Sequence, residues 1–286
     1  MPLTALALVI FAAFTHASWN LLAKRAADCR HFVWFYSAGT VVLWLPVVAI
    51  YLAFERPQLG WPEWIALAGS ALLHTAYSMA LQRGYKVGDL SVVYPLARGT
   101  GPLLSFFGAM LVLGERPGWL ASVGALAVVA GVFMLAGGPR IFHAGGARRS
   151  LFWGVATGAC IAVYTVWDGH AVKVLLLSPL LVDYAGNSLR FLLLTPRALA
   201  DRSTLLPEWR RYWKFALGVS VLGPLGYTLV LFAMQMAPVS HVAPARELSM
   251  MVGAWYGARL LDEGELSRRM LAAGVIVAGV LGLAFG

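Results

Sequence analysis

Ten long apolar segments alternate with short polar links along the whole chain. Most approach the length of about 20 residues that a helix needs to cross the hydrocarbon core of a bilayer. Charges, prolines or glycines bound each segment, and the links are too short to fold as domains. The pattern therefore predicts an all-α polytopic membrane protein with ten transmembrane helices. The predicted helices are 3–23, 32–54, 63–85, 89–113, 117–137, 151–174, 179–200, 211–235, 239–261 and 267–285.

Composition supports a lipid bilayer as part of the solvent. Hydrophobic residues make up 60% of the chain and charged residues only 12%, about half the charged share of an ordinary soluble domain. The net charge of +9 does not indicate nucleic acid, because no cluster of Lys and Arg is interleaved with aromatics. The two cysteines, Cys29 and Cys160, form no disulfide framework. Motifs for metal, dinucleotide or phosphate-loop binding are absent from the sequence, so we expect neither a cofactor nor an enzyme.

An internal repeat divides the chain into two halves. A shift of 148 positions aligns two tryptophan pairs and several other residues at once. We therefore predict a first five-helix repeat over 1–138, a connecting loop over 139–150 and a second repeat over 151–286. An odd number of helices per half gives the halves opposite orientations in the membrane. The aligned pairs are Trp19 with Trp167, Tyr36 with Tyr184, Trp61 with Trp209, Arg98 with Arg246 and Glu115 with Glu263.

Basic residues predict how the chain lies in the membrane. The odd-numbered links between helices hold 16 Lys and Arg residues, whereas the even-numbered links hold 3. Links rich in Lys and Arg stay in the cytoplasm. This bias places both termini outside the cell.

Short motifs in the first half resemble those of the EamA-type drug/metabolite transporter superfamily. They are the run from His16 to Lys24, HASWNLLAK, and the run from Leu113 to Pro117, LGERP, with Leu261-Asp262-Glu263 as a weaker echo in the second half. The resemblance implies ten helices, a central cavity between the halves and alternating access for small metabolites. It also implies a location in a bacterial-type inner (plasma) membrane. Many relatives have cytoplasmic termini, opposite to the orientation that the loop charges predict here.

Ionisable side chains at membrane depth are the candidates for function, because each costs at least about 2.5 kcal/mol on insertion scales. Arg98 and Arg246 each follow a proline, and Arg98 precedes the run Gly99 to Pro102. This composition predicts broken helices at both arginines, where freed N–H groups and a guanidinium would bind a carboxylate or phosphonate. The alternative is that both arginines are held in ion pairs with Glu247, Asp168 or Asp183.

Other polar residues are predicted to line the same cavity. In the first helix His16, Asn20 and Lys24 form one polar stripe beside Trp19, and Trp167 and Asp168 are their counterparts in the second half. The alternative for these residues is packing between helices. Asn187 and Arg190 share a face of the seventh helix, and Tyr94 is predicted as a cavity wall.

His16, His74, Asp168 and Glu247 are candidates for proton coupling, with hydrogen-bonded packing as the alternative for the two histidines. We expect Glu115 and Glu263 to anchor loops by accepting free N–H groups at the start of the next helix.

These features lead to one functional prediction and two alternatives. We expect a secondary transporter, an exporter, of a small zwitterionic or anionic amino-acid-like metabolite. A flippase for a lipid-linked or phosphate-bearing headgroup would require a lateral opening between helices. A non-transporting membrane scaffold would require fully paired buried charges and no cavity. The predicted partners are a small-molecule substrate and the bilayer, with possible proton coupling, and the sequence leaves open whether the protein is a monomer or a homodimer.

Overall fold

The computed structural model describes residues 1–26, 28–87, 90–135, 147–261 and 266–286. These residues form helices and no strand, which confirms the predicted all-α polytopic class. The helices are α1 (Leu3–Arg25), α2 (Phe32–Glu55), α3 (Trp61–Val87), α4 (Leu90–Val112), α5 (Trp119–Leu135), α6 (Ala147–Lys173), α7 (Pro179–Ala200), α8 (Arg202–Met236), α9 (Val239–Ala245), α10 (Leu248–Leu261) and α11 (Leu266–Phe285).

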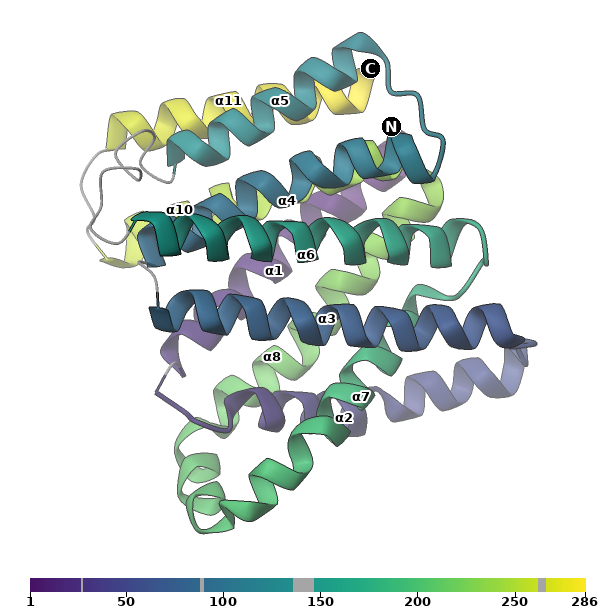
Figure 1. Ribbon diagram of the computed structural model, residues 1–286, viewed down its shortest axis with the longest axis vertical. Helices are drawn as coiled ribbons and strands as arrows, with labels where there is room; N and C mark the ends of the chain where they lie inside the picture. The colour runs from purple at the N-terminus through teal and green to yellow at the C-terminus, as the bar shows by residue number, and fades with distance from the viewer. Residues whose placement is uncertain (27, 88–89, 136–146, 262–265) are drawn as a thin grey trace.

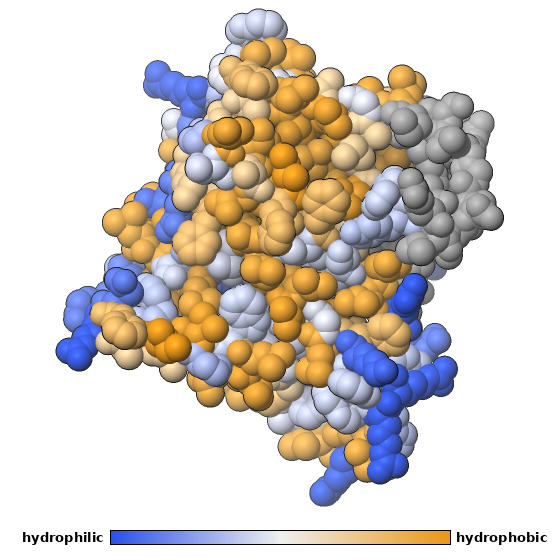
Figure 2. Space-filling model, turned by 180° about the vertical axis from the view of Figure 1, so that it is seen from behind, coloured by the Kyte–Doolittle hydropathy of each residue, from blue (hydrophilic) through white to orange (hydrophobic). Residues whose placement is uncertain are grey.

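The outer surface of the bundle is suited to lipid. Figure 2 shows apolar side chains across the middle of one face, with hydrophilic side chains gathered toward opposite edges. Of the described helices, α1, α2, α3, α6 and α8 each contain a span long and apolar enough to cross a membrane, and α4, α5 and α11 contain shorter apolar stretches. The long helices run between the two hydrophilic edges (Figure 1). The protein is therefore a multi-pass membrane protein.

Helix packing follows a regular scheme. Helix α6 lies against α3 and α4, and α1 correspondingly lies against α8 and α10. Helix α2 packs on α7, and α5 packs on α11 (Figure 1). The 148-residue shift relates the contacts of α6 with α3 and α4 to those of α1 with α8 and α10, and it relates α2 to α7 and α5 to α11. The amino group of Met1 donates to the carbonyl of Ala284 at 2.6 Å, so the two termini lie side by side.

The structure corrects two helix predictions. Helix α8 begins at Arg202 rather than at 211, because its polar first turns continue the helix beyond the apolar segment. The predicted break near Arg98 is wrong, since α4 is continuous from Leu90 to Val112. Thr100 Oγ1 donates to the carbonyl of Leu96 at 2.7 Å, and Ser105 Oγ donates to the carbonyl of Gly101 at 2.8 Å. Hydroxyl donors of this kind satisfy carbonyls in membrane helices that contain proline or glycine.

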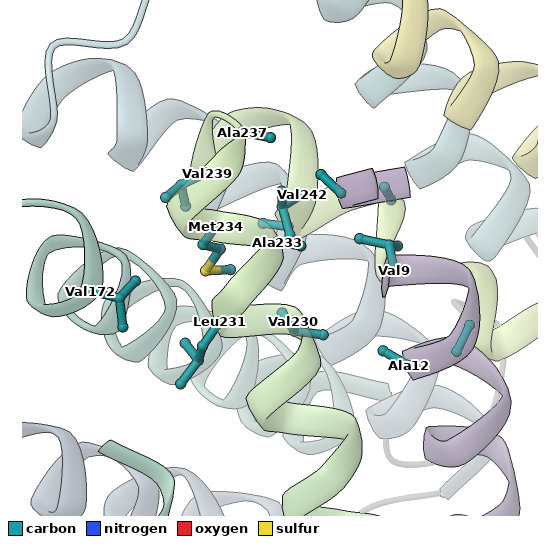
Figure 3. Close-up of a cluster of buried hydrophobic side chains, with 14 of the residues drawn as sticks. Val9, Ala12, Val172, Val230, Leu231, Ala233, Met234, Ala237, Val239 and Val242 are labelled. Atoms are coloured by element: carbon teal, nitrogen blue, oxygen red, sulfur yellow. The ribbon is translucent and has the colours of Figure 1, made fainter. Parts of the chain in front are cut away.

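In the second half the predicted break is present. The segment predicted over 239–261 is divided into α9 and α10, with Arg246 and Glu247 between them. Pro244 has no N–H to donate, and Glu247 N donates to the carbonyl of Pro244 at 3.0 Å, three residues back. The tight turn is held in place by apolar packing of Val239 and Val242 against α8, α1 and α6 (Figure 3). The turn thereby presents two charged side chains to the interior.

Candidate functional site

A cluster of polar side chains lies buried where six parts of the bundle meet. Helices α1, α3, α4, α6 and α8 each contribute, together with the turn between α9 and α10. We call this set the central polar cluster. Its members are His16, His74, Arg98, Tyr164, Asp168, Tyr227, Arg246 and Glu247.

Arg98 joins α4 to two other elements. Its Nη1 donates to Glu247 Oε1 at 3.2 Å, and its Nη2 lies 2.6 Å from His16 Nε2. The Arg98 side chain is 8% exposed and that of Glu247 is 1% exposed. The ion pair that sequence analysis gave as the alternative for Arg98 is therefore present. It is a one-point contact through a single carboxylate oxygen, whereas a guanidinium and a carboxylate can pair through two parallel bonds.

His16 lies between two groups that only donate hydrogen bonds. Arg98 Nη2 faces Nε2 of the imidazole, and Trp19 Nε1 faces Nδ1 at 3.2 Å. A neutral imidazole has one acceptor nitrogen, and a protonated imidazole has none. This position therefore suits a neutral histidine that accepts from one of its two neighbours.

Arg246 has fewer partners than its buried position requires. Its Nη2 donates to the hydroxyl of Tyr164 at 3.4 Å, and its Nε lies 4.0 Å from Glu247 Oε1. The guanidinium also lies 6.0 Å from the centre of the Tyr164 ring, within the range of a cation–π contact. The residue is only 5% exposed. Arg246 is thus held by a phenol and by one carboxylate oxygen that it shares with Arg98.

Asp168 forms the other charged centre of the cluster. Its Oδ2 accepts a hydrogen bond from the hydroxyl of Tyr227 and lies 2.9 Å from His74 Nε2. The same His74 nitrogen lies 3.2 Å from the Tyr227 hydroxyl, and the imidazole stacks on Tyr164 with a ring separation of 4.1 Å. Asp168 is completely buried. These contacts link α6 to α3 and α8 at the level of the cluster.

Three buried atoms of the cluster have no hydrogen-bond partner among the described residues. They are Asp168 Oδ1, Arg246 Nε and Glu247 Oε2. A buried polar atom without a partner costs about 1–3 kcal/mol, and more when the group is charged. Such atoms mark positions where another polar group would bind. The cluster therefore offers both a donor and acceptors to a small polar molecule.

The tryptophan and asparagine predicted in α1 border the cluster. The Trp19 ring meets His16 edge-on at 4.9 Å, which places the indole beside the cluster. Asn20 Nδ2 donates to the carbonyl of His16 at 2.8 Å, within its own helix. The Tyr94 and Lys24 side chains lie outside the part of the chain that the structure describes.

Trp167, the repeat partner of Trp19, is placed differently from the prediction. Its Nε1 donates to the carbonyl of Ala66 at 2.9 Å, and its ring packs over Gly69 of α3. The residue is 37% exposed. Asp168, the next residue along α6, points to the interior and joins the cluster. Trp167 covers the outer side of the contact between α3 and α6.

Asn187 and Arg190 also lie elsewhere than predicted. Asn187 Nδ2 donates to the Asp183 carboxylate at 3.1 Å, and Arg190 Nη1 donates to the Tyr36 hydroxyl at 3.4 Å. Helix α7 packs mainly on α2 and α3. Arg190 therefore joins α7 to α2, Asn187 bonds within its own helix, and neither has a hydrogen bond to the central polar cluster among the described residues.

Two members of the cluster, Tyr164 and Tyr227, were not predicted as site residues. Tyr164 is the counterpart of His16 under the 148-residue shift, which was a usable signal. Tyr227 lies in an otherwise apolar stretch that starts with Gly223 and Pro224. One buried hydroxyl among apolar neighbours requires a partner, and that requirement was the only indication in the sequence.

Glu115 anchors two elements, as predicted, although at a different helix. Its two carboxylate oxygens accept the backbone N–H groups of Val239 and Ser240 at 2.7 and 2.8 Å, at the start of α9 rather than of α5. Lys173, at the end of α6, donates to Glu115 Oε1 at 3.2 Å. Asp262 and Glu263 lie outside the described residues.

A separate apolar groove lies between α2 and the first half of α8. Its volume is about 480 Å³, and only apolar atoms are exposed in it. The residues that line it include Trp34, Val42, Leu206 and Trp209. It contains none of the arginines or acids of the cluster.

The comparisons with known proteins agree on the fold. The model of the EamA-like transporter family matches residues 3–137, nearly the range of the first predicted half. A solved crystal structure, described only as that of a protein, is 16% identical and matches with a TM-score of 0.70 over 98% of each chain. At that identity the likeness concerns the fold alone. None of the curated proteins matches the chain.

Proposed function

Residues 3–137 belong to the EamA-like transporter family, and from this premise we propose that the protein is a secondary transporter whose substrate binds at the central polar cluster. The family consists of membrane transporters of small molecules. The proposed substrate is a small anionic or zwitterionic metabolite of amino-acid type. It crosses the membrane by alternating access between the two halves of the chain.

The observation that carries this proposal is the set of unpartnered buried atoms in the cluster. Arg246 Nε is a donor, and Asp168 Oδ1 and Glu247 Oε2 are acceptors. A free amino acid or aminophosphonate has the complementary groups, an anionic end and an ammonium. We assign the anionic end to Arg98 and Arg246, and the ammonium to the carboxylate of Asp168 or Glu247.

The composition of the cluster also favours this substrate class. Two arginines face two carboxylates, so a zwitterion adds no net charge to the buried region. Guanidinium groups bind carboxylates and phosphonates through paired hydrogen bonds. The Trp19 ring packs on His16, and the Tyr164 and Tyr227 rings pack on each other, so aromatic surface within the cluster would exclude water from these bonds.

The two alternative functions receive less support. A flippase requires a lateral opening that leads a headgroup to the arginines, but the lateral groove between α2 and α8 exposes apolar atoms only. A scaffold requires fully paired buried charges, whereas three charged side chains of the described cluster keep an unpartnered atom.

We further propose that the protein is an exporter in a bacterial-type inner membrane, with both termini outside the cell. The support for this orientation is the distribution of 16 basic residues over the odd-numbered links against 3 over the even-numbered links. Single cysteines introduced at Arg56 and at Arg202 in a cysteine-free background would test this orientation. An impermeant maleimide added to intact cells should label the cysteine at 56 and leave the cysteine at 202 unlabelled.

Uptake into proteoliposomes tests the substrate assignment. The assay uses radiolabelled glycine, L-leucine, L-glutamate and 2-aminoethylphosphonate as separate probes. Arg98→Gln and Arg246→Gln should each reduce transport of the accepted probe by about ten- to a hundredfold, the effect of losing a charged hydrogen bond. Arg202→Gln is the matched control, since Arg202 is exposed at the start of α8. Undiminished transport by the Arg98→Gln/Arg246→Gln double variant would exclude the proposed anion site.

A further inference from the structure

Glu247 occupies the position on Arg98 that a substrate anion would need. Arg98 Nη1 donates to Glu247 Oε1, and Nη2 is occupied by His16. The two outer nitrogens of the guanidinium therefore already have partners inside the protein. A substrate carboxylate that binds Arg98 through both of these nitrogens must displace Glu247 from Nη1 and His16 from Nη2.

The geometry of the contact between Glu247 and Arg98 favours its replacement by a substrate carboxylate. It uses one carboxylate oxygen at 3.2 Å, while the other oxygen, Oε2, is buried without a hydrogen-bond partner among the described residues. A substrate carboxylate that engages both outer nitrogens would make two parallel bonds where Glu247 makes one. The incoming anion thus has a geometric advantage over the resident carboxylate.

Displacement changes the charge balance around Glu247. The charged groups that contact Glu247 are Arg246, beside it on the chain, and Arg98 on α4. His16 on α1 faces Arg98, Tyr164 on α6 faces Arg246, and Asp168 on α6 and Tyr227 on α8 form the rest of the cluster. Two arginines and two carboxylates balance one another. An added anion leaves the buried region with one uncompensated negative charge, which a low-dielectric interior disfavours strongly.

A proton on Glu247 restores that balance. Among the described residues of the cluster, Glu247 is the carboxylate that loses a hydrogen bond, the one from Arg98, when the anion arrives. Asp168 keeps its contacts with Tyr227 and His74. His16 is unsuited to the proton, because Trp19 still donates its N–H to Nδ1, and a protonated imidazole has no nitrogen left to accept it. The freed Glu247 carboxyl has its unpartnered oxygen available to carry the proton.

We propose that Glu247 is an internal competitor for Arg98, and that each net anion that displaces it is bound together with one proton. A zwitterion needs no proton, because its ammonium group pairs with the released carboxylate. This inference rests on the proposed function, since it takes Arg98 as the group that binds the substrate anion. It adds a rule for coupling, in which the number of protons taken up equals the net negative charge of the substrate.

Acetate binding to the purified full-length protein in nanodiscs tests the competition. Saturation-transfer NMR with acetate as the probe suits weak affinities. Uptake of one proton per anion predicts that the affinity of the wild-type protein rises about tenfold for each unit of decrease in pH between 8 and 6. Glu247→Gln should bind acetate more tightly than the wild-type protein at pH 7, and with no dependence on pH. Glu63→Gln, at a half-buried acid in the first turn of α3, is the control and should keep the wild-type slope.

The outcomes separate this inference from the proposed function. An affinity of the wild-type protein that stays constant from pH 8 to 6 would overturn the inference, and so would unaltered acetate binding by Glu247→Gln. Persistence of binding in the Arg98→Gln/Glu247→Gln double variant would instead reject Arg98 as the anion group, and with it the proposed site. The wild-type slope decides the matter even if Glu247→Gln fails to fold.

Glycine tests the proposed relation between the net charge of the substrate and the number of protons taken up. Its affinity, or its transport in proteoliposomes, should be constant over the same pH range, because its ammonium takes the place of the proton. A tenfold change per pH unit for glycine would contradict the pairing of the ammonium with Glu247.

Discussion

Glu115 and Lys173 form an ion pair of 3.2 Å that joins the link after α4 to the end of α6. The same carboxylate accepts two backbone N–H groups at the start of α9. Lys173 also donates to the carbonyl of Ala237 at 3.1 Å, just before that helix. Three parts of the chain are therefore tied together at the base of α9, which carries Arg246 and Glu247 into the cluster.

The first prediction concerns the stability that Glu115 provides. Burial would raise the pKa of this carboxyl, but hydrogen bonds from Ser240 and Val239 and the charge of Lys173 outweigh it and lower the pKa below 4.5. A lowered folded-state pKa stabilises the protein at neutral pH, and this stabilisation is lost as the pH falls below about 4.5 through the folded-state value. Glu115→Gln should lower the free energy of unfolding at pH 7 by about 1.5–3 kcal/mol.

Denaturant unfolding in detergent micelles at pH 7 and at lower pH measures this effect. The difference between the wild-type protein and Glu115→Gln should shrink as the pH falls below 4.5. Glu63→Gln is the matched control, since Glu63 Oε2 accepts the Gly60 N–H at 2.8 Å in an exposed position. A difference that stays constant with pH would show that the charge of Glu115 has no role.

The second prediction concerns the coupling between Arg98 and Glu247. Removing one member of a buried ion pair leaves a buried charge without compensation, which typically costs about 3–5 kcal/mol. Arg98→Gln and Glu247→Gln should each destabilise the protein, and the double variant should lose at least about 1 kcal/mol less than the two losses combined. The same comparison of single and double variants at Arg30 and Asp201, a pair with side-chain exposures of 61% and 26%, should give a coupling energy of less than about 1 kcal/mol. Additive losses at Arg98 and Glu247 would mean that the pair contributes no coupling.

Much of the fold could be predicted because the bilayer imposes one strong requirement. A segment in hydrocarbon must satisfy its own backbone hydrogen bonds as a helix, so the lengths of the apolar segments give the helices. The misplaced start of α8 shows the limit of this reasoning. The residues from Arg202 to Arg210 are too polar to count as a membrane segment, yet they continue the helix to Arg202.

The candidate site was predictable in its residues and less so in their contacts. Arg98, Asp168, Arg246 and Glu247 were identified because charges are rare at membrane depth, and all four are buried together. Their pairing depends on how helices rotate against one another, which a single sequence does not specify. Trp167 illustrates this, since it is adjacent to Asp168 in sequence but faces the outside of the bundle.

The third prediction concerns the close contact between α5 and α11. A Cβ atom added at Gly124 would lie 2.6 Å from the Gly279 carbonyl oxygen and 2.8 Å from Leu283 N. Both are backbone atoms, so the two helices would have to separate. Gly124→Ala should therefore lower the free energy of unfolding by about 1–3 kcal/mol. Gly274→Ala, on α11, meets nothing within 4 Å and should be neutral or slightly stabilising, because alanine favours helix. Equal stabilities of the two variants would contradict the close packing.

The fourth prediction concerns the reactivity of Cys29, in the link between α1 and α2. Burial and the nearby Glu208 carboxylate raise the pKa of this thiol to about 12 from its usual value of 9.0. The thiolate is the reactive form, so at pH 8 its population should be roughly a thousandfold smaller than for an ordinary cysteine. The Sγ atom lies 3.5 Å from Glu208 Oε2, which also accepts the N–H of His31 at 3.1 Å.

Alkylation of Cys29 in a Cys160→Ala background would measure this effect, because the chain contains two cysteines. The rate of reaction with iodoacetamide should be very low at pH 8 and should still be rising at pH 10, with no plateau. Glu208→Gln removes the negative charge next to the sulfur, so it should increase the rate at pH 8 and shift the profile to lower pH. Burial alone would slow both proteins equally and would leave the pH profile unchanged by the substitution. A rate that levels off near pH 9 in the unsubstituted link would show that Glu208 does not hold the thiol in its protonated form.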